Sequence, residues 1–315
     1  MAITIGPGLT ITGGLFFETG SLEPPNPDRA LFAGGNSGSA GVNTIDYVTI
    51  STTGNASDFG DLTVARYYLA GCSSTTRGVF GGGNSGSYSN VIDYVTIASA
   101  GDATDFGDLL STTGILAGCS SATRGLFAGG YTTTYSNVIQ YITIASVGAA
   151  TDFGDLTQAR YGLAACSSPT RGIFGGGDPG GYSNVIDYVT IASAGNATDF
   201  GDLTQARWGL GACASSTRGV FAGGFTGAFS NVIDYVTIAS AGNATDFGDL
   251  PLAGYGTAGC SSDTRGLFAG IGAGSPNNVI NYITIATVGN ATDFGDLIES
   301  RYQLGACSSN HGGLQ

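Results

Sequence analysis

Cysteine is the first residue type to consider in this sequence, because suitably spaced cysteines bind metal ions or form disulfides. Structural zinc requires cysteines, or cysteine and histidine, in close pairs, and a disulfide requires Cα atoms within ~7 Å. The six thiols instead recur once every 47 residues, and equivalent positions of a repeat diverge in space. We therefore predict no metal site and six free buried thiols that pack as small apolar groups. They are Cys72, Cys119, Cys166, Cys213, Cys260 and Cys307.

The phrase Asp-Phe-Gly-Asp-Leu occurs six times, beginning at Asp58, Asp105, Asp152, Asp199, Asp246 and Asp293. Asp-Phe-Gly is also the metal-binding triplet of kinases, but this sequence has no lysine, which excludes a kinase. We expect the Phe to fill an interface between repeats and the Asp residues to cap turns or pair with a recurring arginine. Because arginine binds carboxylates in a bidentate manner, such a pair would tie repeats together. Arg171→Ala should then cost about 3–5 kcal/mol if the pair is buried.

His311 is the single histidine, and any Ser–His–Asp or Cys–His mechanism would have to use it. A pair of glycosidase carboxylates is the other option, but nearly all aspartates recur with the repeat, so no unique pair is visible. Asp46, Asp93, Asp187 and Asp234 share one slot that holds Gln140 and Asn281 in the other two repeats. That exchange suggests a hydrogen-bond acceptor with a structural role. We expect no catalytic residue and no cofactor.

A period of 47 residues predicts a repeat architecture before any local propensity is considered. Val, Ile, Tyr, Phe and Thr runs bounded by Gly, Ser and Asn clusters indicate four short strands in each unit. In one unit these are Tyr161–Cys166, Arg171–Phe174, Asn184–Ile191 and Asp199–Leu203. One four-stranded sheet cannot bury both faces alone, whereas six around an axis can. The sequence predicts an all-β, six-bladed β-propeller over residues 29–315.

The two ends of the repeat region supply a way to close the ring. The first repeat begins at its second strand, near Arg29, and the chain ends just after a first strand, Tyr302–Ser309. We predict that this C-terminal strand joins the N-terminal blade, which removes the open sheet edge.

Net charge restricts the partners. The chain has a formal charge of −13 and a pI of about 4.1, with ten arginines as its only basic side chains apart from His311. Such a protein repels phosphate backbones and anionic lipids, so we expect no nucleic-acid binding and no membrane insertion. No segment has the form of a signal peptide or the length of a membrane span.

The repeats resemble kelch repeats, and the resemblance covers about residues 29–310. Double glycines follow the second strand at Gly34–Gly35, Gly82–Gly83, Gly129–Gly130, Gly176–Gly177 and Gly223–Gly224, and the first strand is preceded by Arg66, Arg160, Arg207 and Arg301. Further along each repeat stand a tyrosine and then a second aromatic residue, as in Tyr47 and Phe59. The chain departs from the pattern at Thr113 and Gly254, which lack the arginine, and Phe replaces the usual Trp. The resemblance implies the propeller fold; a kelch-type copper oxidase would need at least two histidines.

Residues 1–28 lie outside the repeats and comprise a Gly-rich stretch and a linker with three prolines. This opening, joined to near-identical Gly-rich repeats, is similar to structural proteins of marine tailed phages. The resemblance implies a virion protein, made in the host cytoplasm, whose N-terminal arm anchors it to other virion proteins. The alternative is a bacterial kelch-like module that binds protein or carbohydrate and has no link to virions. An enzyme with its site in the propeller channel is a third reading.

The repeats differ from one another mainly in two sets of connections, those between the second and third strands and those between blades. Both sets should project from one side, which we call the variable face, and loops on a rigid scaffold commonly carry recognition. Aromatic residues gather there, and we take them as the candidate site for a host-surface glycan or a neighbouring subunit, with packing as the alternative role. They are Tyr67, Tyr88, Tyr131, Tyr135, Tyr161, Tyr182, Trp208, Phe225, Phe229, Tyr255 and Tyr302.

Overall fold

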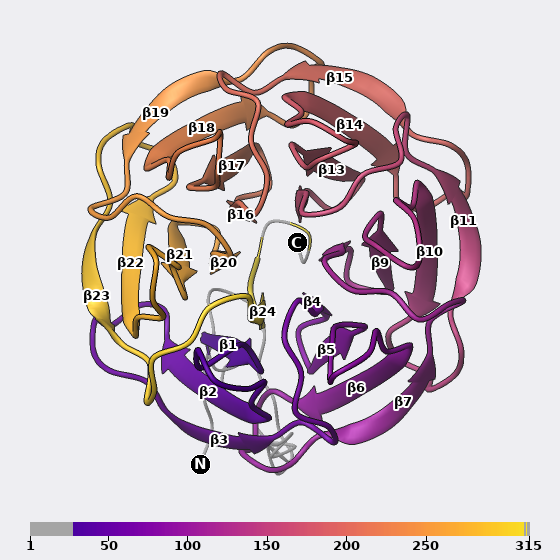
Figure 1. Ribbon diagram of the computed structural model, residues 1–315, viewed down its shortest axis with the longest axis vertical. Helices are drawn as coiled ribbons and strands as arrows, with labels where there is room; N and C mark the ends of the chain where they lie inside the picture. The colour runs from indigo at the N-terminus through magenta and orange to yellow at the C-terminus, as the bar shows by residue number, and fades with distance from the viewer. Residues whose placement is uncertain (1–27, 312, 314–315) are drawn as a thin grey trace, which may run out of the picture.

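The computed structural model describes residues 28–311 and 313, and over them it confirms the predicted six-bladed β-propeller (Figure 1). Each blade is one antiparallel sheet of four strands, and in all but the first blade their order in space follows the order in the chain. Among the residues described, no helix is long and apolar enough to cross a membrane. Of the predicted N-terminal arm, residues 1–27 lie outside the described part of the chain.

The blades use strands of nearly constant length. The first strands, nearest the axis, are β4 (Ala70–Ser73), β8 (Ala117–Ser120), β12 (Ala164–Ser167), β16 (Gly211–Ala214), β20 (Ala258–Ser261) and β24 (Gly305–Ser308). The second are β1 (Arg29–Ala33), β5 (Arg77–Gly81), β9 (Arg124–Ala128), β13 (Arg171–Gly175), β17 (Arg218–Ala222) and β21 (Arg265–Ala269). The third are β2 (Thr44–Thr49), β6 (Val91–Thr96), β10 (Val138–Thr143), β14 (Val185–Thr190), β18 (Val232–Thr237) and β22 (Val279–Thr284). The outer strands are β3 (Ser57–Asp61), β7 (Thr104–Asp108), β11 (Thr151–Asp155), β15 (Thr198–Asp202), β19 (Thr245–Asp249) and β23 (Thr292–Asp296).

The C-terminal strand closes the ring as predicted. β24 pairs antiparallel with β1, from Ala30 opposite Ser308 to Ala33 opposite Gly305, so the first blade is assembled from both ends of the chain. In Figure 1 the yellow β24 lies beside the indigo β1. The strand is shorter than the predicted Tyr302–Ser309, because Tyr302 pairs with Asn36 and Gln303 has a φ of 60°, which interrupts the extended backbone before Gly305.

The core lies between blades, where apolar side chains from neighbouring sheets meet. The Asp-Phe-Gly phenylalanines fill these interfaces as predicted; Phe200 of one blade packs in the same cluster as Val236 and Ile238 of the next. The backbone and the packing also explain why the third residue of the triplet is glycine. Gly201 lies at a β-bulge with φ of 144°, and a Cβ there would stand 2.6 Å from the backbone of Gly242 in the next blade.

All six cysteines are free and buried, as predicted. Their sulfur atoms point into the interfaces between blades, where five of them lie against a glycine of a neighbouring second strand, whereas Cys260 packs in one cluster with Ala30. A Cβ added at Gly125, for example, would lie 2.6 Å from Cys72 Sγ. Burial raises the pKa of the Cys166 and Cys307 thiols to about 12, so they remain protonated packing groups.

The prediction for Arg171 and its equivalents was wrong. These six strand arginines begin the second strands and pair with no aspartate; the Arg171 guanidinium lies 4.7 Å from the centre of the Tyr188 ring and donates a hydrogen bond of 2.9 Å to the Ile238 carbonyl of the next blade. They do tie neighbouring blades, but through a carbonyl. The same pattern recurs around the ring and closes with Arg265 bound to Ile50 in the first blade.

The buried ion pairs belong to the other series, which we call the linker arginines. Each joins the segment between two blades to an aspartate in the third strand of the blade that follows. Arg160 lies 2.8 Å from Asp187, with both side chains fully buried. The four pairs are Arg66–Asp93, Arg160–Asp187, Arg207–Asp234 and Arg301–Asp46.

These pairs correct the inference that the aspartate slot needs only an acceptor. In the third blade Thr113 replaces the arginine and Gln140 replaces the aspartate, and in the sixth Gly254 and Asn281 do so. Gln140 keeps the acceptor role, since its side-chain oxygen binds the Leu110 N–H at 2.7 Å. Both charges are lost together, because either one alone would be buried without a partner.

Candidate functional site

The two variable sets of connections lie on one side of the propeller. Strands in each blade alternate in direction, so the loop from the second to the third strand and the linker to the next blade leave the sheet at the same end. The opposite side carries the turns that begin with Ser-Ser or precede the outer strand, and we call it the turn face. The predicted separation into two faces therefore follows from the observed topology.

The structure brings ten of the eleven predicted aromatics into one continuous network of ring contacts. Neighbouring centroids lie 5.3 to 6.4 Å apart. The path runs from Tyr88 through Tyr131 to Tyr161 and Trp208, and then through Tyr255 to Tyr302. Tyr135, Tyr182, Phe225 and Phe229 join it from the loops. Tyr67 is the exception, since its ring contacts only Tyr68 among the described rings.

A hollow of about 320 Å³ lies within this network, where the aromatic slot before each blade is interrupted. Five blades have an aromatic residue there and the third has Gly114. The ring of Tyr88 occupies part of the space, so that a Cβ at Gly114 would lie 2.6 Å from it. The hollow is lined by Tyr68, Tyr88, Ile115, Tyr131, Tyr135, Tyr161 and Trp208.

Beneath the aromatics, six backbone groups encircle the channel mouth. Each N–H donates to the carbonyl of the equivalent residue in a neighbouring blade, at 2.6 to 2.9 Å, and all six residues have positive φ. Three are glycines, whereas Ile115 holds a φ of 60°, which is strained for a β-branched residue. The members are Tyr68, Ile115, Gly162, Gly209, Gly256 and Gln303. This collar fixes the base on which the aromatic rings stand.

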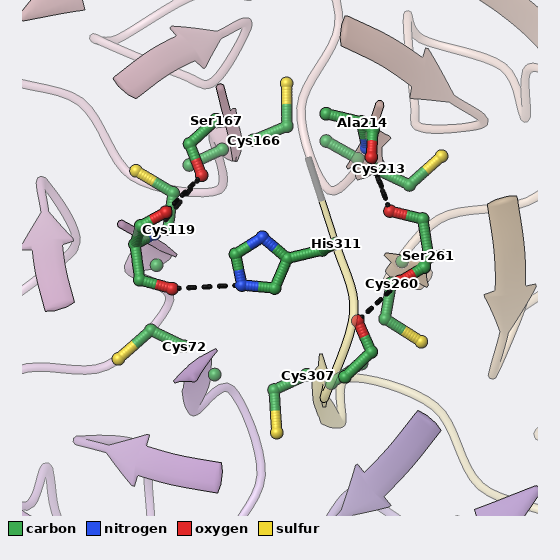
Figure 2. Close-up of a pocket in the computed structure, with 18 of the residues that line it drawn as sticks. Cys72, Cys119, Cys166, Ser167, Cys213, Ala214, Cys260, Ser261, Cys307 and His311 are labelled. Atoms are coloured by element: carbon green, nitrogen blue, oxygen red, sulfur yellow. Dashed lines mark hydrogen bonds between the residues drawn. The ribbon is translucent and has the colours of Figure 1, made fainter. Parts of the chain in front are cut away.

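The other channel mouth has a different character. Serine hydroxyls from the first strands donate to carbonyls of neighbouring blades, as Ser120 does to Ser73 at 2.7 Å, and Ala214 interrupts the series. Figure 2 shows the cysteine sulfur atoms directed away from the channel centre, where the His311 ring lies. The cysteines therefore present no thiol to that ring.

His311 is held as a neutral imidazole. Its Nδ1 accepts a hydrogen bond from the Gly313 N–H at 3.0 Å, so Nε2 carries the proton and faces Ser120 Oγ at 3.2 Å. Enclosure in the channel lowers the pKa of His311 to about 4. No carboxylate orients the ring in the described residues, and the Ser120 hydroxyl already donates to Ser73. Within that part of the chain, no three or more His, Cys, Asp or Glu side chains form a metal-binding group either.

The variable face carries no free basic side chain. Four of the ten arginines are the buried linker arginines, and the other six begin the second strands at the turn face. Acidic groups are present: Asp178 accepts a hydrogen bond from the Tyr161 hydroxyl at 3.4 Å. The desolvation of Tyr161 and the nearby Asp178 raise the pKa of that phenol to about 12. The electrostatic character of this face is therefore neutral to negative.

Sequence reasoning missed Tyr68, Ile115 and Asp178 as parts of this site. Asp178 occupies the loop position that holds the predicted Tyr131 and Phe225 in other blades, so alignment of the repeats places it there. Ile115 and Tyr68 stand one residue after the predicted aromatic slot. The signal for that position was the run of glycines at 162, 209 and 256.

Two comparisons with known proteins were negative. No family model matches the sequence, and no curated protein matches it. The kelch resemblance thus rests on the repeat residues and the six-bladed fold.

Proposed function

We propose that this chain is a non-enzymatic recognition protein that binds surface glycans through the aromatic network on its variable face. The observation that supports this is the contact of ten predicted aromatic rings around one channel mouth, on the side where the repeats differ. Exposed tyrosine and tryptophan rings offer apolar faces to sugar rings and hydroxyl or N–H groups to sugar oxygens. The rest of the fold is a rigid support, as recognition loops require.

The setting we propose is the virion of a tailed phage, as a tail-fibre, tip or capsid-surface propeller. The support for this is the resemblance of the Gly-rich repeats and of residues 1–28 to phage structural proteins. A bacterial kelch-like binding module is the alternative setting for the same face. Co-purification of the full chain with assembled particles, and its loss when residues 1–28 are deleted, is the expected result; a chain never found with particles would contradict the virion setting.

A glycan array tests the recognition itself. Trp208→Ala and Tyr131→Ala should each remove most of the signal, because both rings are central in the network. Val147→Ala is the matched control, an exposed apolar residue in a turn-face loop. No signal from the wild-type protein, or a signal indifferent to both aromatic changes, would refute glycan binding; association with another virion protein would then indicate a protein partner.

A further inference from the structure

The hollow beside Gly114 is lined almost entirely by aromatic rings. Six of its seven lining residues are aromatic, and the seventh is Ile115, held in a strained backbone conformation. The Tyr131 ring lies at 86° to Tyr161 and at 62° to Tyr135. Rings at such angles direct several π faces toward one open hollow, so a compact guest would touch several of them at once.

The charges around the hollow decide which guest these π faces suit. A ring face is electron-rich and attracts a cation within about 6 Å. Asp178 does not line the hollow, but its carboxylate accepts the hydrogen bond of the lining Tyr161 hydroxyl at 3.4 Å and so places a negative charge near it. The variable face has no free arginine to repel a cation or to bind an anion, and the whole chain carries −13. An anionic guest would find no counter-ion here, whereas a cationic one is attracted by the net negative charge.

The polar groups of the lining narrow the class of cation further. A primary ammonium group has three N–H donors, and each needs an acceptor when it leaves water. The hollow offers tyrosine hydroxyls and one nearby carboxylate, but mostly ring faces. A quaternary ammonium group has no donor to satisfy and carries its charge on methyl groups that pack against rings.

We propose that the hollow lined by Tyr88, Tyr131, Tyr135, Tyr161 and Trp208 binds a quaternary ammonium group, as found in choline or in a trimethyllysine side chain. This proposal goes beyond glycan binding: the hollow shares Tyr131 and Trp208 with the proposed glycan surface, but its guest is selected by charge and by methyl groups.

Trp208 is the only tryptophan of the chain and lines the hollow, so its fluorescence reports binding directly. We expect choline and tetramethylammonium to change the emission saturably at millimolar concentrations. Dimethylbutanol, the neutral carbon isostere of choline, should bind about tenfold more weakly because it lacks the cation–π attraction. Calorimetry of the same mixtures detects a guest that binds without changing the emission of Trp208. No heat and no emission change with choline, or equal affinity for the isostere, would overturn the proposal.

The repeats supply a matched pair of variants that locates the site. Tyr135 and Tyr182 occupy the same loop position in neighbouring blades and are both 40% exposed, but only Tyr135 lines the hollow. Tyr135→Ala should weaken choline binding about tenfold, by loss of one ring, and Tyr182→Ala should leave it unchanged. Equal losses in both variants would place the guest elsewhere and overturn the assignment.

Peptides distinguish the two sources of the group and the need for methylation. A peptide with trimethyllysine should compete with choline, and the same peptide with unmodified lysine should compete much less, although both carry one positive charge. Equal competition by the two peptides would overturn the assignment to a quaternary cation. The glycan array and the choline titrations use different ligands, so either proposal can fail while the other holds.

Discussion

Replacing Arg160 and Asp187 by the residues that stand in the same slots of the third blade tests whether buried charge or mere packing governs the linker pairs. The pair is fully buried at 2.8 Å. Arg160 also donates to the carbonyls of Val185 and Phe174, and Asp187 accepts from the Thr157 hydroxyl at 2.6 Å. Arg160→Thr leaves a carboxylate and Asp187→Gln leaves a guanidinium without its counter-ion. We expect each single change to lower the free energy of unfolding by about 3–5 kcal/mol.

The double variant should be more stable than either single variant. It reproduces the neutral pair of Thr113 and Gln140, which the same fold accommodates in the third blade. Replacing both charges removes the desolvation cost along with the attraction, so the net loss should be about 1–2 kcal/mol. Unfolding in urea, which adds no salt, gives the three free energies for a double-mutant cycle.

The result that would refute this reasoning is additivity. If the double variant loses the sum of the two single losses, the side chains contribute separately and the charge pairing explains nothing. Arg171→Ala serves as the control for removing an arginine that has no carboxylate partner. It loses the contact with the Tyr188 ring and the hydrogen bonds from one guanidinium nitrogen to the Ile238 and Ala239 carbonyls, so about 1–2 kcal/mol is expected, below the 3–5 kcal/mol that the sequence suggested.

Three further changes test the closure, the tail and the serine series. Deletion of residues 301–315 removes β24, exposes the edge of β1, and should give an aggregating protein with a broad melting transition by size exclusion and calorimetry; unchanged melting would contradict the closure. The pKa of His311 is lowered from 6.5 to about 4, so the unfolded chain takes up the proton first. The stabilisation that the neutral His311 ring gives is therefore complete above pH 6.5 and lost as the pH falls toward 4. The difference in unfolding free energy between wild type and His311→Gln should shrink over that range. A constant difference would refute the enclosure of the ring. Ala214→Ser would supply the hydroxyl missing opposite the Ser167 carbonyl and should add about 0.5–1.5 kcal/mol in urea unfolding, whereas a loss would show that the slot has no room for it.

The fold was predictable because the period and the phase of the repeats are global properties of the sequence. Six copies of one four-strand pattern fix the blade count, and a first strand at the C-terminus fixes the closure. The gathering of the aromatics followed from the same logic, since equivalent loop positions in an alternating sheet must share a face. None of these inferences depended on where a side chain points.

The partner of each arginine could not be predicted from one repeat alone, because both series recur at the same spacing as the aspartates. Comparison across the repeats holds the answer: Thr113 accompanies Gln140 and Gly254 accompanies Asn281. The hollow was unpredictable for a different reason. The space left by the missing side chain at Gly114 can be filled by a neighbouring residue, and only the placement of the Tyr88 ring shows how much of it remains.

The assembly of one blade from both ends of the chain has a mechanical consequence. Arg29 and Ser308 lie at the same blade, so a pull applied between the two ends of the propeller loads the short ladder between β1 and β24 and leaves the other five sheets unstressed. Because Ala30 lies opposite Ser308, both ends pull on the same end of the ladder, which peels apart pair by pair, and the remaining blades then unravel one after another from a free edge. The resistance of the whole ring to force is then the resistance of four residue pairs.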